Sequence, residues 1–257
     1  AIMDFEIAPE TRALLDGLDA FIEAEIRPLE QQDDNVRFFD HRREWARTDF
    51  EHGGVPRADW EALLAEMRRR ADRAGFLRLA LPEDLGGVSA SNLTMAIVRE
   101  HLAAKGLGLH NDLQNESSIV GNFPTLLMMR DFGTPAQKAA FMEKIARGEA
   151  RLAFGLTAPN HGSDETNLET TAVRDGDGWV LDGMKRWNSG LHHATHDIIF
   201  ARTSGKRGSP KGITAFLVPT DAPGFRVEFF WWTFNMPTDH AEVSLNAVRV
   251  PDDAVFG

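Results

Sequence analysis

The chain contains no cysteine and no tyrosine among its 257 residues. Without cysteine it has no disulfides, no thiolate nucleophile and no thiolate metal ligand, which suits a reducing, cytoplasmic location. Phenolic acid–base chemistry is excluded as well. The sequence also has no apolar run of membrane-spanning length, and its amino terminus lacks the basic and then apolar pattern of a secretory signal. We therefore expect no membrane insertion.

Positive charge is scarce. The chain has 28 Lys and Arg against 39 Asp and Glu, a formal net charge of −11. A nucleic-acid groove or an anionic membrane surface requires a basic patch, so the composition disfavours both as partners. A polyanionic small molecule remains compatible with this charge, because backbone N–H groups and a few local cations are enough to bind it.

Apolar residues recur every three or four positions in the first 150 residues, which is the pattern of amphipathic helices. Residues 151–257 instead read as short strands separated by Gly, Asp and Pro, with a hairpin turn at 175–178. We predict an α+β protein, with an all-α domain at 1–150 and an antiparallel, sandwich-like or barrel-like β domain at 151–257. The expected helices are 9–28, 58–74, 93–104, 117–132 and 135–147; the expected strands are 151–157, 169–174, 179–182, 197–203, 212–218, 225–230 and 241–250.

Two segments about twenty residues apart carry the strongest functional signal: FGLTAPNHGSD at 154–164 and GMKRWNS at 183–189. Each places small or hydroxyl side chains beside glycine or tryptophan. This combination allows a backbone and an aromatic ring to press against a flat, phosphate-bearing cofactor. Taken singly, Gly-Ser-Asp is more often an ordinary turn and Trp187 more often a core residue. Together they indicate a flavin site.

Two other kinds of site are weighed against the flavin reading. His192, His193 and His196 invite a metal site, but they follow Ser189 in a loop without a well-placed carboxylate, so we expect no metal. A hydrolase triad within residues 161–164 is disfavoured, because neighbours in sequence rarely reach the geometry of nucleophile, base and orienting acid.

The order of these landmarks resembles the amino-terminal and middle domains of the acyl-CoA dehydrogenase family. The matching segments are 75–82 with the Gly86-Gly87 pair, 132–138, 156–164, 183–189 and 245–257. The resemblance spans essentially the whole chain. It departs from the family pattern at Ala158, where the family usually has glutamate, and at His161, where alanine or glycine is common, so the polarity of this loop is redistributed. Asn188 replaces a usual isoleucine, which makes that wall of the flavin pocket more polar.

The resemblance implies FAD as cofactor. It implies that Trp187 packs on the flavin ring, that the Ser189 hydroxyl meets flavin N5, and that Ser163 lies where the cofactor meets the acyl-CoA pyrophosphate. The residues expected to bind the cofactor are Phe154, Gly155, Leu156, Thr157, Gly162, Ser163, Trp187, Asn188 and Ser189, with Ser163 also expected to bind substrate.

The resemblance further implies α,β-dehydrogenation of an acyl-CoA thioester, with electrons passed to an electron-transferring flavoprotein by a homodimer or homotetramer. A eukaryotic member would be expected in the mitochondrial matrix. The family's second helical domain, which supplies the catalytic base, would begin where this sequence stops, so the base is assigned to no residue. Two alternatives remain open: a flavin monooxygenase or oxidase on the same scaffold, and a non-catalytic partner subunit.

Overall fold

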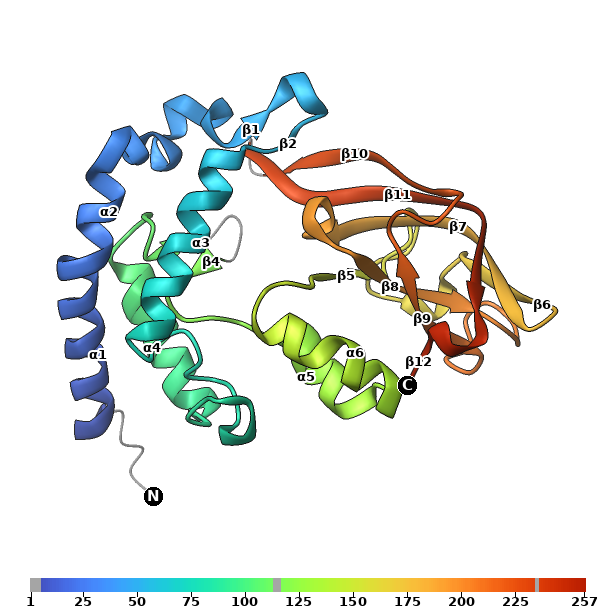
Figure 1. Cartoon of the computed structure of the whole chain (residues 1–257), viewed down its shortest axis with the longest axis horizontal. Coiled ribbons are helices and arrows are strands. Elements are labelled where there is room, and N and C mark those ends of the chain that lie inside the picture. The colour runs from blue at the N-terminus through green and yellow to red at the C-terminus, as the bar shows by residue number, and fades with distance from the viewer. Residues whose placement is uncertain (1–5, 113–116, 234–235) are drawn as a thin grey trace. The chain divides into compact units, whose positions relative to one another are not determined.

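The computed structural model describes residues 6–112, 117–233 and 236–257. The chain divides into two compact units, which are described separately. The first comprises the described parts of 1–48 and 57–123, and the second comprises 49–56 and 124–257. The predicted α+β class is confirmed, because a helical first unit is followed by a β-sheet unit (Figure 1). The domain boundary expected at 150 stays a prediction.

The first unit is built around three long helical segments. α1 (Pro9–Phe21) continues through a wider turn at Ile22–Ile26 into α2 (Arg27–Gln31). The other helices are α3 (Ala58–Arg73) and α4 (Asn92–Ala104), and the short strands β3 (Asn111–Asp112) and β4 (Ser117–Ser118) pair with each other. Their apolar faces meet in one core, whose most deeply buried members include Leu18, Ile22, Ile26, Trp60, Met67, Val98 and Leu102.

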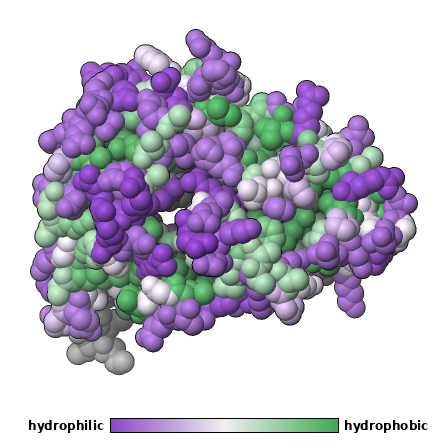
Figure 2. Space-filling model, in the orientation of Figure 1, coloured by the Kyte–Doolittle hydropathy of each residue, from purple (hydrophilic) through white to green (hydrophobic). Residues whose placement is uncertain are grey.

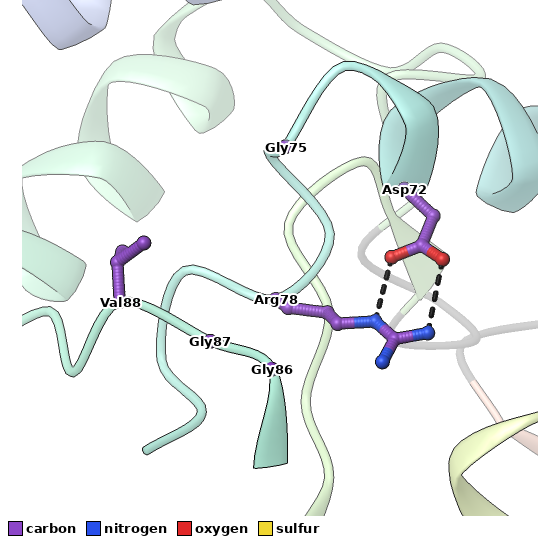
Figure 3. A pocket seen from close by; sticks show the side chains of 6 residues that line it. All are labelled: Asp72, Gly75, Arg78, Gly86, Gly87 and Val88. Carbon is purple, nitrogen blue, oxygen red and sulfur yellow. Dashed lines mark hydrogen bonds and ion pairs between the residues drawn. The ribbon is translucent and has the colours of Figure 1, made fainter. Parts of the chain in front are cut away.

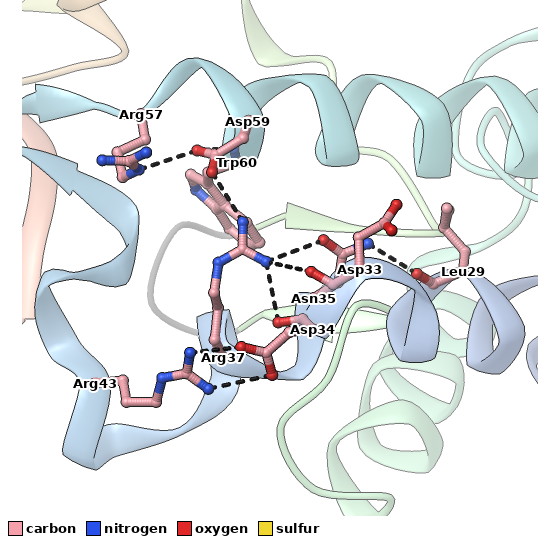
Figure 4. Close-up of polar contacts among 9 residues, drawn as sticks. All are labelled: Leu29, Asp33, Asp34, Asn35, Arg37, Arg43, Arg57, Asp59 and Trp60. Atoms are coloured by element: carbon pink, nitrogen blue, oxygen red, sulfur yellow. Dashed lines mark hydrogen bonds and ion pairs between the residues drawn. The ribbon is translucent and has the colours of Figure 1, made fainter.

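Polar contacts tie the segment after α2 to the start of α3 (Figure 4). Arg37 donates to the backbone carbonyls of Asp33 and Asp34, and its second terminal nitrogen donates to Asp59 at 2.8 Å. Asp33 and Asp34 adopt positive φ angles of 46° and 57°. A left-handed backbone is tolerated better by Asp than by most residues, and here it turns two carbonyls toward one guanidinium.

The expected helix at 117–132 is wrong over its first seven residues, 117–123. Ser117–Ser118 form strand β4, and helix α5 (Pro124–Phe132) begins only at its proline. Proline fits the first turn of a helix, where its missing N–H costs nothing, but it disfavours helical backbone just before it. Gly121 moreover donates its N–H to the carbonyl of Leu77, 2.8 Å away, which ties this stretch to another part of the first unit.

The second unit contains the helix pair α5 and α6 (Pro135–Ala146) and an eight-stranded sheet. Thr134 and Gln137 form a capping box at the start of α6, and the Gln137 amide donates to the carbonyls of Asp253 and Val255. These two hydrogen bonds anchor the capped helix to the last turn of the sheet. The small strands β1 (Thr48–Asp49) and β2 (Val55–Pro56) precede these elements in the chain.

The sheet runs in the order β10-β11-β7-β6-β8-β9-β12, with β5 pairing beside β8. Most neighbours are antiparallel as predicted, but β5 and β6 each pair with β8 in parallel. The strands are β5 (Leu152–Gly155), β6 (Thr171–Asp175), β7 (Gly178–Ser189), β8 (His196–Arg202), β9 (Ile213–Pro219), β10 (Phe225–Thr233), β11 (Met236–Pro251) and β12 (Val255–Phe256).

Strand β7 is much longer than the 179–182 predicted, because β11 pairs with it along nearly its whole length. The segment 183–189 is thus part of the sheet.

The face of the molecule shown in Figure 2 carries mostly hydrophilic residues, with hydrophobic ones between them, as expected for a chain with 26% charged residues.

Candidate functional site

The two segments singled out in the sequence lie side by side in the second unit. The backbone N–H of Arg186 donates to the Thr157 carbonyl at 2.9 Å, and its guanidinium donates to the Pro159 carbonyl at 3.4 Å. The Lys185 ammonium donates to the Leu156 carbonyl at 2.7 Å. Three hydrogen bonds therefore join the stretch after β5 to the last third of β7.

A β-bulge sets the position of Trp187. Asn188 pairs with Ala241 and Arg186 with Glu242, so Trp187 is an extra residue opposite consecutive residues of β11. Its φ angle of 68° is left-handed, which is strained for a bulky side chain. The indole is 40% exposed and its ring lies 4.7 Å from that of Trp231. The left-handed backbone at this bulge therefore holds a large aromatic ring at the surface.

Most of the other expected cofactor residues are accessible. Thr157 and Leu156 are half-buried, and the Thr157 hydroxyl donates to Glu165 at 3.2 Å. The Ser189 hydroxyl lies 2.7 Å from Nδ1 of His240 on β11. The exposed members of the set are Phe154, Gly162, Ser163, Trp187 and Ser189.

Gly155 and the Asn188 side chain lie beneath this surface. Asn188 is fully buried, and its amide donates to Asp197 at 2.5 Å. A Cβ on Gly155 would meet Ile199 at 2.6 Å, the Asn188 amide nitrogen at 2.8 Å and Asp197 at 3.1 Å. Glycine is required here because the strand presses directly on these side chains. Both residues support the accessible surface from below.

A buried charged cluster underlies the junction of the two segments. Lys185 and Asp197 have no exposed surface. Burial lowers the pKa of Lys185 to about 8, against the opposing effect of Glu165 and Asp197. Burial also raises the pKa of Asp197 to about 7, opposed by the Asn188 hydrogen bond and by Lys185. One side-chain oxygen each of Asn188, Asp197 and Glu165 is buried without a hydrogen-bond partner in the described part of the chain.

Sequence reasoning missed the residues that brace Trp187 from β10 and β11. Glu242, only 4% exposed, accepts two hydrogen bonds from Arg186, at 2.8 and 3.1 Å, and one from the indole N–H of Trp231 at 3.2 Å. The Arg186 guanidinium lies 4.9 Å from the centre of a Trp231 ring. Trp231 and Glu242 lie 45 and 56 residues after Arg186, and only the pairing of β11 with both β7 and β10 brings the three together.

The residues weighed for a metal or a hydrolase site make the following contacts within the second unit. His161 lies 2.8 Å from Arg207, whereas the Asp164 carboxylate accepts from Thr166 and Asn167. His192 and His193 lie in a 3₁₀ turn, and their ring centres are 4.0 Å apart. Asp164 is thus held by its own loop, as a turn residue would be.

The landmark at 75–87 has a structural explanation within the first unit. Gly75 and Gly86 have positive φ angles, and a Cβ on Gly87 would lie 2.0 Å from the Leu81 carbonyl oxygen. These turns border a cavity of about 290 Å³, in which Arg78 and Asp72 point toward each other with contacts of 2.7 and 3.0 Å (Figure 3). Each charge offsets the other, so the cavity presents no unbalanced charge from this pair.

No helix within residues 6–112, 117–233 and 236–257 combines the length and apolar character of a membrane span.

Comparison with known proteins agrees with the order of landmarks. The family model for the acyl-CoA dehydrogenase N-terminal domain matches residues 8–149, and that for the middle domain matches residues 153–248. FadE12, an acyl-CoA dehydrogenase of Mycobacterium tuberculosis, is 33% identical over 193 residues, covering 75% of this chain and 48% of FadE12. A 3-(aryl)acrylate reductase of Clostridium sporogenes is 34% identical over 202 residues, covering 75% and 50%.

The fold is similar to solved structures as well. One of an acyl-CoA dehydrogenase-type protein from Mycobacterium abscessus superposes with a TM-score of 0.76 and 27% identity, covering 98% of this chain and 61% of that one. The chain spans about half the length of the two curated relatives described above. Both family models and the shared fold show that the chain belongs to the acyl-CoA dehydrogenase family.

Proposed function

We propose that the chain forms the helical and flavin-binding parts, 1–150 and 151–257, of an FAD-dependent acyl-CoA dehydrogenase. The observation that carries this proposal is the junction of the two segments, where three hydrogen bonds hold 156–159 against 185–186. The strained bulge at Trp187 displays an indole directly beside that junction. Strain retained at an accessible aromatic residue is typical of a functional site.

The residues of this surface fit a flavin. Trp187 offers an exposed ring face, and stacking on an aromatic ligand contributes roughly 1 kcal/mol beyond the buried area. Thr157 and Ser189 add hydroxyl groups, whereas Phe154 in β5, Leu156 just after it and Gly162 in the following loop supply backbone. Gly155 and Asn188 support the surface from below. Bound FAD would supply the two-electron redox chemistry that the side chains themselves lack.

The proposed substrate is an acyl-CoA thioester, oxidised between its α and β carbons. Ser163 is exposed beyond the turn of the first segment, and we assign it to the pyrophosphate of the substrate. The reaction also needs a base for the α proton and polarisation of the thioester carbonyl. We assign the base to no residue of this chain, and we propose an electron-transferring flavoprotein as electron acceptor.

Two further proposals concern the oligomeric state and the location of the protein. We propose a homodimer or homotetramer, the assembly expected from the family resemblance, and a cytoplasmic location, which the absence of cysteine suits. Size measurement at several protein concentrations tests the first, and localisation of the tagged protein tests the second.

The monooxygenase or oxidase alternative would be favoured by polar side chains at Asn188 and His161 that are available to a second ligand. Asn188 is buried against Asp197, and His161 faces Arg207 and lies 3.8 Å from Glu169. Asn188 is fully buried, and His161 already contacts a charged side chain. The dehydrogenase is accordingly the function that the site supports best.

The decisive experiment is titration of the purified protein with FAD, followed by anaerobic addition of acyl-CoA thioesters of several lengths. We expect the chain to turn yellow with FAD, and to bleach with a preferred thioester and reoxidise slowly in air once the part of the enzyme that supplies the base is present. Because one relative is named for acrylate reduction, the reduced protein is also offered enoyl thioesters. A colourless protein that takes up no FAD would support the non-catalytic alternative, and rapid reoxidation by oxygen would support an oxidase.

A matched pair of variants links FAD binding to the bulge. Trp187→Gly removes the indole and relieves the left-handed strain, so the sheet is expected to remain folded while FAD affinity falls at least tenfold. Ala247→Gly relieves a similar strain, at a φ angle of 51°, in another irregular part of the β7–β11 pairing. This control is expected to leave FAD affinity unchanged.

A further inference from the structure

Ser189 and His240 lie directly opposite each other on β7 and β11. Residues at opposed positions of antiparallel strands project to the same side of the sheet, so their side chains meet. The Ser189 hydroxyl oxygen is 2.7 Å from Nδ1 of His240, which is a normal hydrogen-bond distance. This contact lies two residues from the exposed Trp187 indole.

The surroundings of the imidazole determine which partner donates. Oδ1 of Asp239 lies 3.5 Å from the same Nδ1 atom. A negative carboxylate favours a proton on the nitrogen that it faces, because a bare nitrogen would present its lone pair to the charge. Nδ1–H of His240 therefore donates to the Ser189 oxygen. The hydroxyl has a single proton, and this arrangement leaves that proton free for another acceptor.

Among the residues that the structure describes, the alternative acceptor for the Ser189 hydroxyl is poor. The carbonyl of Trp187 lies 3.5 Å away, which is too long for a strong hydrogen bond. Ser189 is exposed, so its proton can reach a ligand on the Trp187 side of the sheet.

We infer that His240 is a positioning residue that directs the Ser189 hydroxyl proton toward the acceptor nitrogen of the flavin. The inference rests on the proposed function and deepens it. His240 does not touch the cofactor in this role. By filling the acceptor side of the serine oxygen, it fixes the hydroxyl as a donor and strengthens that donor through a chain of hydrogen bonds.

The first test needs no cofactor. Nitrogen NMR of protein labelled with ¹⁵N-histidine, assigned with a His240→Asn variant, reports whether Nδ1 carries a proton. We expect the protonated Nδ1 signal at pH 7. A bare Nδ1 would overturn the inference while leaving the proposed flavin site untouched.

The second test separates donation from packing. His240→Asn keeps an N–H donor near the position of Nδ1, whereas His240→Leu has a similar size and no donor. We expect the FAD dissociation constant to stay within about threefold for Asn and to rise about tenfold for Leu, the scale of one hydrogen bond. The flavin midpoint potential should shift in the Leu variant only.

The control variant is His196→Asn. This imidazole also faces a hydroxyl, with Nδ1 3.1 Å from Thr195 Oγ1, but that hydroxyl is not one of the proposed cofactor residues. FAD binding with equal values for Asn and Leu at position 240 would overturn the inference. A wild-type protein that binds no FAD would overturn the proposed function, and this role with it.

Discussion

The Lys185 ammonium donates to the carbonyl oxygen of Leu156 at 2.7 Å, from a position with no solvent exposure. A buried charge is costly unless its partners are close, so this contact constrains where the first segment runs relative to β7. The hydrogen bond therefore couples the stability of the sheet to the shape of the proposed site.

Lys185→Met should lower the free energy of unfolding by about 2–3 kcal/mol, because Leu156 loses its donor and Asp197 loses a nearby positive charge. FAD affinity should fall as well, since the segment after β5 loses an anchor. Denaturant unfolding and FAD titration measure the two effects. Lys206→Met, at an exposed position in the loop after β8, should change stability by less than about 0.5 kcal/mol.

Asp197 should give stability an unusual pH dependence. Its pKa is raised to about 7 in the folded protein from an ordinary value of 3.8, so the folded protein holds this proton where the unfolded chain has released it. The contribution is fully present below about pH 4 and is lost as the pH rises to about 7. Between these limits, wild type should lose roughly 2–4 kcal/mol relative to Asp197→Asn.

Unfolding curves at several pH values measure this difference, which cancels the titration of groups that do not interact with Asp197. Asp177→Asn serves as control, because Asp177 is exposed in the hairpin turn before β7. A constant difference between wild type and Asp197→Asn across this range would contradict the assigned proton.

Two glycines of the first segment should respond differently to alanine. Gly155→Ala should destabilise the protein by about 1–3 kcal/mol, because the new Cβ would press on Ile199, Asn188 and Asp197. Gly162 has no atom within 4 Å of the corresponding position, so Gly162→Ala should change stability by less than about 0.5 kcal/mol. Loss of FAD affinity in the stable Gly162 variant would report direct contact with the cofactor.

The buried ion pair of the first unit should be sensitive to loss of one charge. Arg47 and Asp112, 5% and 1% exposed, are 2.6 Å apart, and Arg47 also stacks 4.4 Å from the Trp60 ring. Asp112→Asn should cost about 3–5 kcal/mol, since it removes the buried carboxylate that faces the Arg47 guanidinium.

Thermal and denaturant unfolding test this change against Glu143→Gln, which removes an exposed contact with Arg147 on and just after α6. That variant should cost at most about 0.5 kcal/mol. Similar losses of unfolding free energy in Asp112→Asn and Glu143→Gln would show that burial does not determine the contribution of the Arg47–Asp112 pair.

Local patterns predicted much of the fold. The helices around Leu18, Trp60 and Leu102 could be found from apolar spacing alone, because each buries one continuous face. The pattern failed at 117–132, where apolar residues precede Pro124 without forming a helix. Periodicity does not reveal that Gly121 is tied to Leu77, far away in sequence.

The site could be predicted only at the level of segments. Small residues and Trp187 marked both stretches, but the pairing of Asn188 with Asp197 depends on strand order, and the meeting of Ser189 with His240 depends on register. Neither the strand order nor the register can be read directly from a single sequence. This is why Lys185, Asp197 and His240 were missed although two of them lie within or next to the expected strands.

The bulge at Trp187 changes the phase of β7. Before it, Leu181 and Lys185 lie on the buried side at even spacing; after it, Asn188 is buried although it lies three residues beyond Lys185. A regular strand would have turned Asn188 outward and Trp187 inward. The inserted residue therefore shifts the alternation of buried and exposed side chains by one position in the last residues of β7. As a result the charged cluster is buried and the Trp187 indole is exposed. Deleting Trp187, as opposed to replacing it, would remove the bulge and restore regular alternation, with Asn188 still facing inward and Ser189 outward.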